Sequence, residues 1–362
     1  MKVNRLSIEK FRNIENMNIE PCDNVNVIYG ENAQGKTNII ESIWLCTGCR
    51  SFRGTKDREL VKFGEERAKI SLDFFGSDRE QNIKIDIADK REMKLNDIKL
   101  SSCSKSIGEF VSVVFSPVHL SLIKQGPSER RKFLDIAISQ LKPQYASYLT
   151  KYNRAVSQRN ALLKDIVIHS ELYDTLDIFE DSIAAYASKI AVYRLSYLER
   201  LKEEVNAIYN GISSGREAIS LRYMQNEDGE NYSDKESYLI KLKQARKTDI
   251  MTGSTSIGPH RDDLEIMING ISARKYGSQG QQRSCALALK LGEANVIGSI
   301  TKERPVALLD DVMSELDISR QDYILNHIKD WQVFITCCDP NTIAHLKEGK
   351  SFHIENGKVV SN

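Results

Sequence analysis

The chain has 362 residues, of which 41% are hydrophobic and 28% are charged, and its formal net charge is +1. These proportions are those of an ordinary globular protein, so they exclude a largely disordered or collagen-like chain, and the length allows two domains or lobes. Because the net charge is close to zero, any nucleic-acid partner must bind to a local basic patch.

The sequence carries no pattern typical of membrane or secreted proteins. No window approaches the ~18 apolar residues of a membrane span, and the N-terminal residues lack a basic stretch followed by an apolar run. The seven cysteines are scattered between Cys22 and Cys338, and we expect reduced thiols instead of a disulfide framework. Cys46 and Cys49 form one CxxC pair, but a zinc site would need a second ligand pair. We therefore expect a cytoplasmic protein without a membrane partner.

The first region, to about residue 125, is predicted to consist of strands with one helix. Apolar runs and alternating patterns indicate strands at residues 3–11, 25–29, 82–87, 93–100 and 111–115. Asn96 and Asp97 suit a turn within the fourth of these segments. The helix is expected at residues 38–45.

The second region, about 128–250, is predicted to be helical. From residue 172 to 197 the apolar positions are alternately four and three apart, which is a heptad pattern. A similar stripe runs from residue 145 to 163, and a polar turn near His169 would fold the two helices into an antiparallel pair. The helix at about 171–209 would be ~60 Å long. Ser233 and Glu236 suggest a capping box for a further helix before Gly253.

The third region, 251–362, returns to alternating strands and helices. Strands are expected at residues 264–268, 306–309 and 333–336, a helix at 279–298, and a hairpin at 352–360. The fold class is therefore α/β, with the two ends of the chain forming one head that a helical arm interrupts. The predicted boundaries are 1–127 and 251–362 for the head and 128–250 for the arm.

Residues 30–37, GENAQGKT, match the phosphate-binding pattern G-x-x-x-x-G-K-[ST] between a predicted strand and a predicted helix. Glycines allow the backbone amides to turn toward phosphates, Lys36 would reach the β- and γ-phosphates, and Thr37 would bind Mg²⁺. We therefore predict ATP and Mg²⁺ as cofactors. The expected nucleotide contacts are Gly30, Glu31, Asn32, Ala33, Gln34, Gly35, Lys36, Thr37 and Asn38.

Two further segments complete the predicted site. Residues 306–311, VALLDD, form a buried strand that ends in carboxylates, and Asp310 is expected to bind the magnesium ion together with Thr37. Residues 277–284, GSQGQQRS, precede a helix and allow two interpretations: a plain N-cap of Ser278 with Gln281, or an anion site at the helix start. Beside the other motifs we favour the second interpretation. It makes Ser278, Gln279, Gly280 and Gln281 phosphate contacts.

Five segments in this order resemble the RecF family, in the SMC-like branch of the ABC-type ATPases. They are GENAQGKTN, SPVHLSLIKQGPSERRKFLD at 116–135, GPHRDDLE at 258–265, GSQGQQRS, and LLDDVMSELD at 308–317. The resemblance implies an ABC/SMC-type head with two lobes, a short arm and an ATP-dependent homodimer.

The resemblance also implies how two subunits would share one nucleotide. Ser278 and Gly280 of one subunit would close on the γ-phosphate that the other subunit holds with Lys36 and Thr37. Residues 314–317, including Asp317, would form the D-loop that crosses the interface.

Two catalytic roles follow from the same resemblance. Gln125 would be the Q-loop glutamine, and Asp311 occupies the place where many related ATPases carry the glutamate that orients water. Because aspartate is one methylene shorter, we hypothesise slow hydrolysis, with ATP used as a switch. Two departures are visible: no histidine occurs in residues 336–339, and Val118 replaces the acidic residue expected after Pro117.

The implied function is an ATP-gated DNA clamp of recombinational repair, which recognises single-stranded, gapped or junction DNA, works with RecR and RecO, and assists RecA loading in replication and the SOS response. A solvated helical surface explains any basic cluster equally well. The candidate DNA contacts are Arg50, Arg53, Lys56, Arg58, Arg130, Arg131, Lys132, Lys151, Arg154 and Arg159.

Two other functions fit the sequence less well. A nucleotide-binding subunit of an ABC transporter is disfavoured by the heptad pattern at 172–197 and by the missing LSGGQ sequence. A structural SMC-like protein would need a longer arm.

Overall fold

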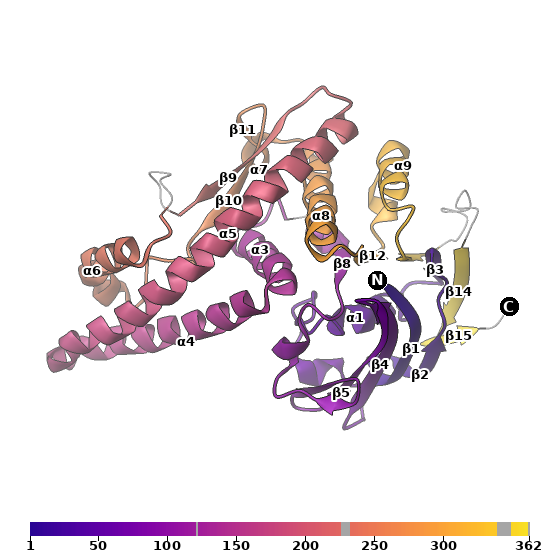
Figure 1. Cartoon of the computed structure of the whole chain (residues 1–362), viewed down its shortest axis with the longest axis horizontal. Helices are drawn as coiled ribbons and strands as arrows, with labels where there is room; N and C mark the ends of the chain where they lie inside the picture. The colour runs from indigo at the N-terminus through magenta and orange to yellow at the C-terminus, as the bar shows by residue number, and fades with distance from the viewer. Residues whose placement is uncertain (121, 226–231, 339–348, 361–362) are drawn as a thin grey trace. The chain divides into compact units, whose positions relative to one another are not determined.

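The computed structural model describes residues 1–120, 122–225, 232–338 and 349–360 (Figure 1). The chain forms two compact units, and each is described by itself. The first comprises Met1–Ser121, Gly211–Ser214 and Ala286–Asn362, and the second comprises Leu122–Asn210 and Gly215–Cys285. The sequence prediction grouped residues 251–285 with the ATPase head, whereas the compact units place them with the helical region.

An antiparallel sheet of six strands makes up one layer of the first unit, in the order β2-β1-β4-β5-β6-β7. Buried and exposed residues alternate along β4, as expected for a sheet with one face against a core. The strands β2 and β4 were not predicted from the sequence. The bounds are β1 Lys2–Phe11, β2 Ile14–Ile19, β4 Ala68–Gly76, β5 Arg79–Ile87, β6 Arg91–Leu95 and β7 Ile98–Lys99.

The second sheet of this unit has the order β15-β14-β3-β13-β12-β8, and all its pairs are parallel except β14 with β15. Every residue of β12 and β13 is buried, which confirms the parallel strands predicted from their apolar runs. The bounds are β3 Val25–Tyr29, β8 Ser112–Phe115, β12 Val306–Asp310, β13 Val333–Cys337, β14 Gly349–Glu355 and β15 Lys358–Val360.

The predicted C-terminal hairpin is also confirmed. Asn356 and Gly357 connect β14 to β15 with φ angles of 49° and 71°, the left-handed conformation that this residue pair favours. Because β14 pairs with β3, the hairpin lies beside the strand that leads into the phosphate-binding loop.

The remaining helices and short turns of this unit connect its sheets, and α1 packs on β12 and β13. Their bounds are α1 Lys36–Leu45, η1 Asp57–Leu60, η2 Cys103–Ser106, α2 Pro117–Leu120, η4 Met313–Glu315 and α9 Ile318–His327. The helix α8, Gln279–Thr301, begins in the second unit and continues in the first.

The second unit combines long helices with a small antiparallel sheet, β11-β10-β9. The predicted antiparallel helix pair is confirmed, because Tyr145 near the start of α4 packs on Tyr193 of α5 at 5.8 Å between ring centroids, and Leu163 near its end clusters with Leu176 (Figure 1). The bounds are α3 Pro127–Leu141, α4 Pro143–Ile166, η3 Ser170–Thr175, α5 Leu176–Ser213, β9 Ile219–Met224, α6 Lys235–Thr252, β10 Asp263–Ile268, β11 Ile271–Ser272 and α7 Ala273–Tyr276.

Two details of this unit differ from the prediction. The N-cap of α6 is Asp234, whose carboxylate accepts the Ser237 N–H at 2.7 Å, so the capping box of Ser233 and Glu236 was wrong. The strand β9 lies in a region predicted to be wholly helical. Its partner β10 follows about forty residues later, and two strands that pair over so long a separation leave no local signal in the sequence.

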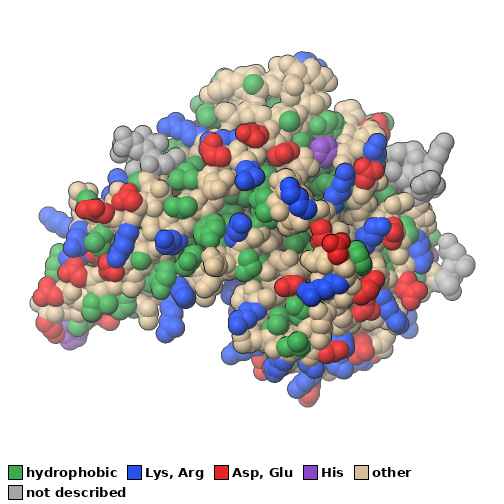
Figure 2. Space-filling view, viewed as in Figure 1, with side chains coloured by type: hydrophobic (Ala, Val, Ile, Leu, Met, Phe, Trp, Pro, Cys, Tyr) green, Lys and Arg blue, Asp and Glu red, His purple; other side chains and the backbone are tan. Residues whose placement is uncertain are grey.

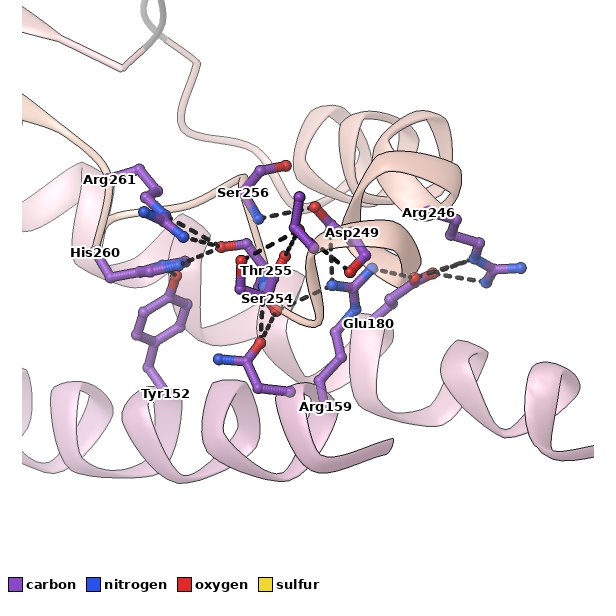
Figure 3. Close-up of polar contacts among 12 residues, drawn as sticks. Tyr152, Arg159, Glu180, Arg246, Asp249, Ser254, Thr255, Ser256, His260 and Arg261 are labelled. Carbon is purple, nitrogen blue, oxygen red and sulfur yellow. Dashed lines mark hydrogen bonds and ion pairs between the residues drawn. The ribbon is translucent and has the colours of Figure 1, made fainter. Parts of the chain in front are cut away.

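Arg159 of α4 lies at the centre of a buried ionic cluster in this unit (Figure 3). Its guanidinium donates to Asp249 at 2.7 Å, to Glu180 at 2.9 Å and to the Thr255 hydroxyl at 3.0 Å. Arg159, Glu180 and Asp249 are all fully buried, so Arg159 cannot contact DNA, and its assignment as a DNA contact was wrong.

We predict that Arg159→Ala lowers the free energy of unfolding by about 3–5 kcal/mol, because it leaves two buried carboxylates without this partner. Arg154→Ala, an exposed residue five positions earlier on the same helix, should change it by less than ~0.5 kcal/mol. Urea unfolding followed by circular dichroism measures both values. Equal values for the two variants would contradict the structural role of Arg159.

Candidate nucleotide-binding site

The phosphate-binding loop connects β3 to α1, and its two glycines have conformations that other residues rarely adopt. Gly30 has a φ of 149°, and a Cβ at this position would lie 2.3 Å from the carbonyl oxygen of Ile354. Gly35 has a φ of 108°, and its Cβ would lie 2.6 Å from Asn13 Oδ1. The spacing of glycines in the motif is therefore a steric requirement of this loop.

Segments distant in the sequence hold the loop in place. The backbone N–H of Asn356 donates to Gln34 Oε1 at 2.6 Å, and the N–H of Gly357 donates to the Gln34 carbonyl at 3.0 Å. On another side, Asn13 donates to the Ala33 carbonyl at 3.3 Å and accepts from Asn38 at 2.8 Å. Sequence reasoning assigned Asn356 only to a turn and Asn13 to no role, because both act through the tertiary fold.

Lys36 is buried, and its ammonium group lies over its own loop. It donates to the carbonyl of Gly30 at 2.6 Å and to that of Glu31 at 2.8 Å. An ammonium group has three N–H donors, and the third donates to Cys338 Sγ, a weak acceptor, at 3.8 Å. The Cys338 thiol in turn donates to Asn32 Oδ1 at 3.2 Å.

The first turn of α1 provides backbone donors for an anion. Its N-cap is Gly35, which has no side chain that could accept a hydrogen bond from the amides of this turn. The first amides of a helix lack intrahelical acceptors and lie at the positive end of the helix dipole. Together with Lys36, this helix start fits a phosphate group.

Asp310 ends the buried strand β12 and faces Thr37. Its Oδ1 accepts hydrogen bonds from the hydroxyls of Thr37 at 2.8 Å and of Thr336 at 3.0 Å. Burial raises the pKa of Asp310, although these two hydroxyls oppose the shift. A cation beside the carboxylate would stabilise its ionised form.

These groups fit a magnesium ion. A carboxylate and a hydroxyl oxygen are hard ligands of the kind that Mg²⁺ prefers, and Mg²⁺ in nucleotide sites takes one or two protein ligands plus phosphates and water. In the described part of the chain no cluster of three or more His, Cys, Asp or Glu side chains could hold a metal by itself. Thr37 and Asp310 are therefore the residues that would hold Mg²⁺.

Asp311 follows with a left-handed φ of 50°, and its side chain is half-buried. Its N–H donates to Thr336 Oγ1 at 2.9 Å, and its carbonyl accepts from the Ser314 hydroxyl at 2.8 Å. Burial raises the pKa of Asp311, while the charge of Lys36 opposes this shift. Since aspartate tolerates a left-handed φ better than glutamate does, the backbone conformation favours the shorter acid at this position.

Thr336 thus contacts both the carboxylate of Asp310 and the backbone of Asp311, a role that sequence reasoning missed because it looked for a histidine in residues 336–339. Asp339 lies outside the described residues. Glu41 of α1 was also missed: it is fully buried and accepts two hydrogen bonds from Arg12 at 3.1 Å.

The segment 277–284 lies in the second unit and has the geometry of a reciprocal cap. Ser278 Oγ accepts the Gln281 N–H at 3.2 Å, and the Ser278 N–H donates to Gln281 Oε1 at 2.8 Å. The cap interpretation is therefore realised. It leaves the exposed Ser278 hydroxyl able to donate its own proton to a phosphate.

The other predicted catalytic and interface residues lie at chain turns. Gln125, in the second unit, has an exposed side chain, and its carbonyl accepts from Arg130 at 2.8 Å. Asp317 is the N-cap of α9 and accepts the Arg320 N–H at 3.1 Å.

Among the basic candidates, Arg130 was wrongly assigned to DNA. It is buried, and its guanidinium forms a double hydrogen bond with Asp263 at 2.7 and 2.9 Å. Arg131 donates to the Asp262 carbonyl at 2.8 Å, and Lys132 is half-buried. The exposed candidates are Arg50, Arg53, Lys56, Arg58, Lys151 and Arg154.

The segment 258–265, which carried the family resemblance without a role, joins elements of the second unit (Figure 3). A Cβ on Gly258 would lie 2.2 Å from the Tyr152 hydroxyl oxygen. His260 Nε2 donates to the Thr255 carbonyl at 2.9 Å, so its Nδ1 accepts from the Tyr152 hydroxyl at 2.5 Å. Burial lowers the pKa of His260 to about 4, which keeps the ring neutral.

Comparison with known proteins gave matches over the whole chain. The family described as "RecF/RecN/SMC N terminal domain" matches residues 2–360. The DNA replication and repair protein RecF of Acetivibrio thermocellus is 40% identical over 360 residues, 98% of each chain. That of Clostridium perfringens is 41% identical over 364 residues, 99% of each chain.

Solved structures gave a consistent result. A structure of the recombination mediator protein RecF with ATP, in the RecFOR pathway, matches with a TM-score of 0.91 and 38% identity, over 99% of this chain and 97% of that one. The Smc head domain of Pyrococcus furiosus matches with a TM-score of 0.57 and 18% identity, over 100% of this chain and 96% of that one, which shows a shared fold. None of the helices within the described ranges has the length and apolarity needed to cross a membrane.

We predict that Asp310→Asn weakens Mg²⁺-dependent nucleotide binding at least tenfold, about 1.4 kcal/mol, while the protein stays folded, because the amide oxygen can still accept from both threonines. Titration calorimetry with and without Mg²⁺ measures this effect. In EDTA the two proteins should bind nucleotide alike. If nucleotide binding by the two proteins depends equally on Mg²⁺, Asp310 is not a magnesium ligand.

The same variant has a predicted pH signature. Since the pKa of Asp310 is raised in the folded state, ionisation of this carboxyl opposes folding as pH rises from its unfolded to its folded pKa. Without nucleotide, Asp310→Asn should therefore be at least as stable as the wild type above that interval. Protons should also compete with Mg²⁺ in the wild type, so its affinity should fall with falling pH more than that of the variant.

Proposed function

Because this chain belongs to the RecF family of SMC-like ATPases, we propose that it is an ATP-dependent DNA-binding protein of DNA replication and repair. The observation that carries the proposal is the hydrogen bond of Thr37 to Asp310, which joins the phosphate-binding loop to the end of a buried strand. That arrangement is the one expected for MgATP, and a relative of 38% identity has been solved with ATP.

Each protein group has a distinct part in binding. Lys36 and the first amides of α1 would hold the β- and γ-phosphates, and Thr37 and Asp310 would hold Mg²⁺. Bound MgATP would supply a charged γ-phosphate that a second subunit can recognise. Gln125 would act as the Q-loop glutamine.

We propose that two copies of the chain complete each nucleotide site. Ser278 and Gly280 of one copy would contact the phosphate held by the other copy, with Gln279 and Gln281 beside them. Ser314 and Asp317 would cross the interface. Both are exposed, and next to them Ile318 is 75% exposed, an apolar side chain that a subunit interface would bury.

Asp311 would orient the attacking water, and its short side chain would keep hydrolysis slow, so that ATP acts as a switch. Asp311→Asn should lower turnover by about 10²-fold or more, because it removes a general base. Asp311→Glu should raise turnover, at a stability cost of about 1 kcal/mol from the left-handed φ. A phosphate-release assay checks both; if neither variant changes the rate, Asp311 has no catalytic role.

For DNA we propose the exposed basic residues Arg50, Arg53, Lys56, Arg58, Lys151 and Arg154, with Arg131 and Lys132 as partly exposed additions. On the face shown in Figure 2, Lys and Arg side chains are interspersed with Asp and Glu. A site made by two copies of the chain would gather such residues without a large basic patch on one copy.

By family relationship, the DNA would be single-stranded, gapped or a junction, and the protein partners would be RecR, RecO and RecA in the cytoplasm, with roles in replication and the SOS response. The structure with ATP in the RecFOR pathway supports this proposal. A transporter subunit is not favoured, because the full-length relatives are named as DNA replication and repair proteins.

We predict that the wild type sediments as a dimer with ATP and as a monomer without it. Lys36→Met should stay monomeric because it loses phosphate contacts, and Ser278→Arg should bind ATP but fail to dimerise. Analytical ultracentrifugation with and without gapped DNA measures these states.

The salt dependence of DNA binding is the control for the measurements with gapped DNA. Affinity of the ATP-bound dimer for DNA should fall steeply between about 50 and 200 mM salt, by roughly 10³-fold for about six phosphate contacts. A wild type that stays monomeric with ATP and DNA contradicts the clamp, and a shallow salt slope contradicts the proposed contacts.

A further inference from the structure

Glu217 lies in the turn between α5 and β9, and its carboxylate links two elements of the second unit. Its Oε2 accepts a hydrogen bond from the Tyr209 hydroxyl at 2.7 Å, and its Oε1 accepts one from Gln281 Nε2 at 2.7 Å. Tyr209 belongs to α5, the long helix of the arm, and is fully buried. Gln281 is the residue that forms the reciprocal cap with Ser278.

The bonds around Gln281 determine which way its amide points. The Ser278 N–H can only donate, so it must face the amide oxygen, at 2.8 Å. An ionised Glu217 can only accept, so it must face the amide nitrogen. Both neighbours demand the same orientation, and Tyr209 in turn holds the Glu217 carboxylate. The chain of bonds therefore runs from α5 through Glu217 and Gln281 to Ser278.

We propose that Glu217 is a positioning residue that sets the orientation of Ser278 for the phosphate of a second subunit. This inference rests on the proposed role of Ser278 in the ATP-bound dimer. A glutamine at 281 without this partner could rotate its amide and release the Ser278 N–H, and the serine hydroxyl would then sample several positions. Glu217 prevents this by binding the amide nitrogen.

A single substitution, Gln281→Glu, distinguishes this positioning role from simple helix capping. Glutamate is the usual partner of serine in a capping box, so Gln281→Glu preserves the acceptor for the Ser278 N–H. It also places a second carboxylate against Glu217, and like charges at hydrogen-bond distance repel. In the monomer, capping alone predicts that Gln281→Glu leaves the cap intact, whereas a positioning role for Glu217 predicts that it loosens the cap.

Exchanging both residues restores each of these bonds. In the double variant Glu217→Gln with Gln281→Glu, the amide at position 217 accepts from Tyr209 through its oxygen and donates through its nitrogen to the carboxylate at position 281. That carboxylate still accepts from the Ser278 N–H. The double variant has the same composition and net charge as the wild type, so it is a matched control.

Glu217→Gln alone should preserve hydrogen bonds to both Tyr209 and Gln281. Its amide oxygen can accept from Gln281 while its nitrogen donates to the Tyr209 hydroxyl oxygen, because a phenol both donates and accepts. In the nucleotide-free monomer, only Gln281→Glu of the three variants should therefore disturb the cap, although all three change nothing but residues 217 and 281.

The experiment measures ATP-dependent dimerisation of the full chain by sedimentation. Gln281→Glu should weaken the dimer at least ~10-fold, about 1.4 kcal/mol, and Glu217→Gln should lie within about threefold of the wild type. The double variant is compared in the nucleotide-free monomer, because its carboxylate at position 281 would lie beside the phosphate of the second subunit. ATP affinity at protein concentrations that keep the chain monomeric is the reference for each variant. The inference is overturned if Gln281→Glu dimerises like the wild type, or if hydrogen exchange at residues 278–282 of the monomer is as fast in the double variant as in Gln281→Glu.

A second readout uses the nucleotide-free monomer. Hydrogen exchange of the amides in residues 278–282 should be faster in Gln281→Glu and return to the wild-type rate in the double variant. If this pattern appears while the wild type never dimerises, the positioning role stands and the proposed function fails. If exchange is the same in the wild type and all its variants, Glu217 does not position Ser278.

Discussion

The carboxylate of Asp310 is the group on which the nucleotide site depends. It ends a strand whose residues are all buried, and a buried carboxylate is costly unless hydrogen bonds or a cation compensate for lost water. Thr37 from the phosphate-binding loop and Thr336 from β13 supply those hydrogen bonds. The loop, β12 and β13 are thereby held in one geometry, and Thr336 extends the same network to the backbone of Asp311.

The same requirement, that buried polar groups be paired, organises the second unit. Arg159 is surrounded by two buried carboxylates, and Arg130 by Asp263 and backbone carbonyls. Elsewhere in this unit, Glu217 connects a buried tyrosine of the arm helix to the cap of Ser278. Arginines and carboxylates that the sequence alone would place at the surface thus stabilise the interior.

Sequence reasoning succeeded where the signal was local. Residues 25–45 were predicted as strand, loop and helix, because an apolar run, a glycine pattern and a helical segment follow one another directly. It failed where a partner lies far away in the chain. The strand β9 needs β10, and Arg130 is separated from Asp263 by 133 residues, so nothing near either residue reveals its burial.

The sequence by itself determined the α/β class, the helical arm, the positions of Lys36, Thr37 and Asp310, and the family resemblance, because these depend on residue patterns within short segments. Only the tertiary structure decided which basic residues are exposed, that Asn13 and the 356–357 turn brace the loop, and that Gln281, which caps Ser278, donates to Glu217. Those outcomes depend on burial and on hydrogen-bond partners, which folding alone brings together.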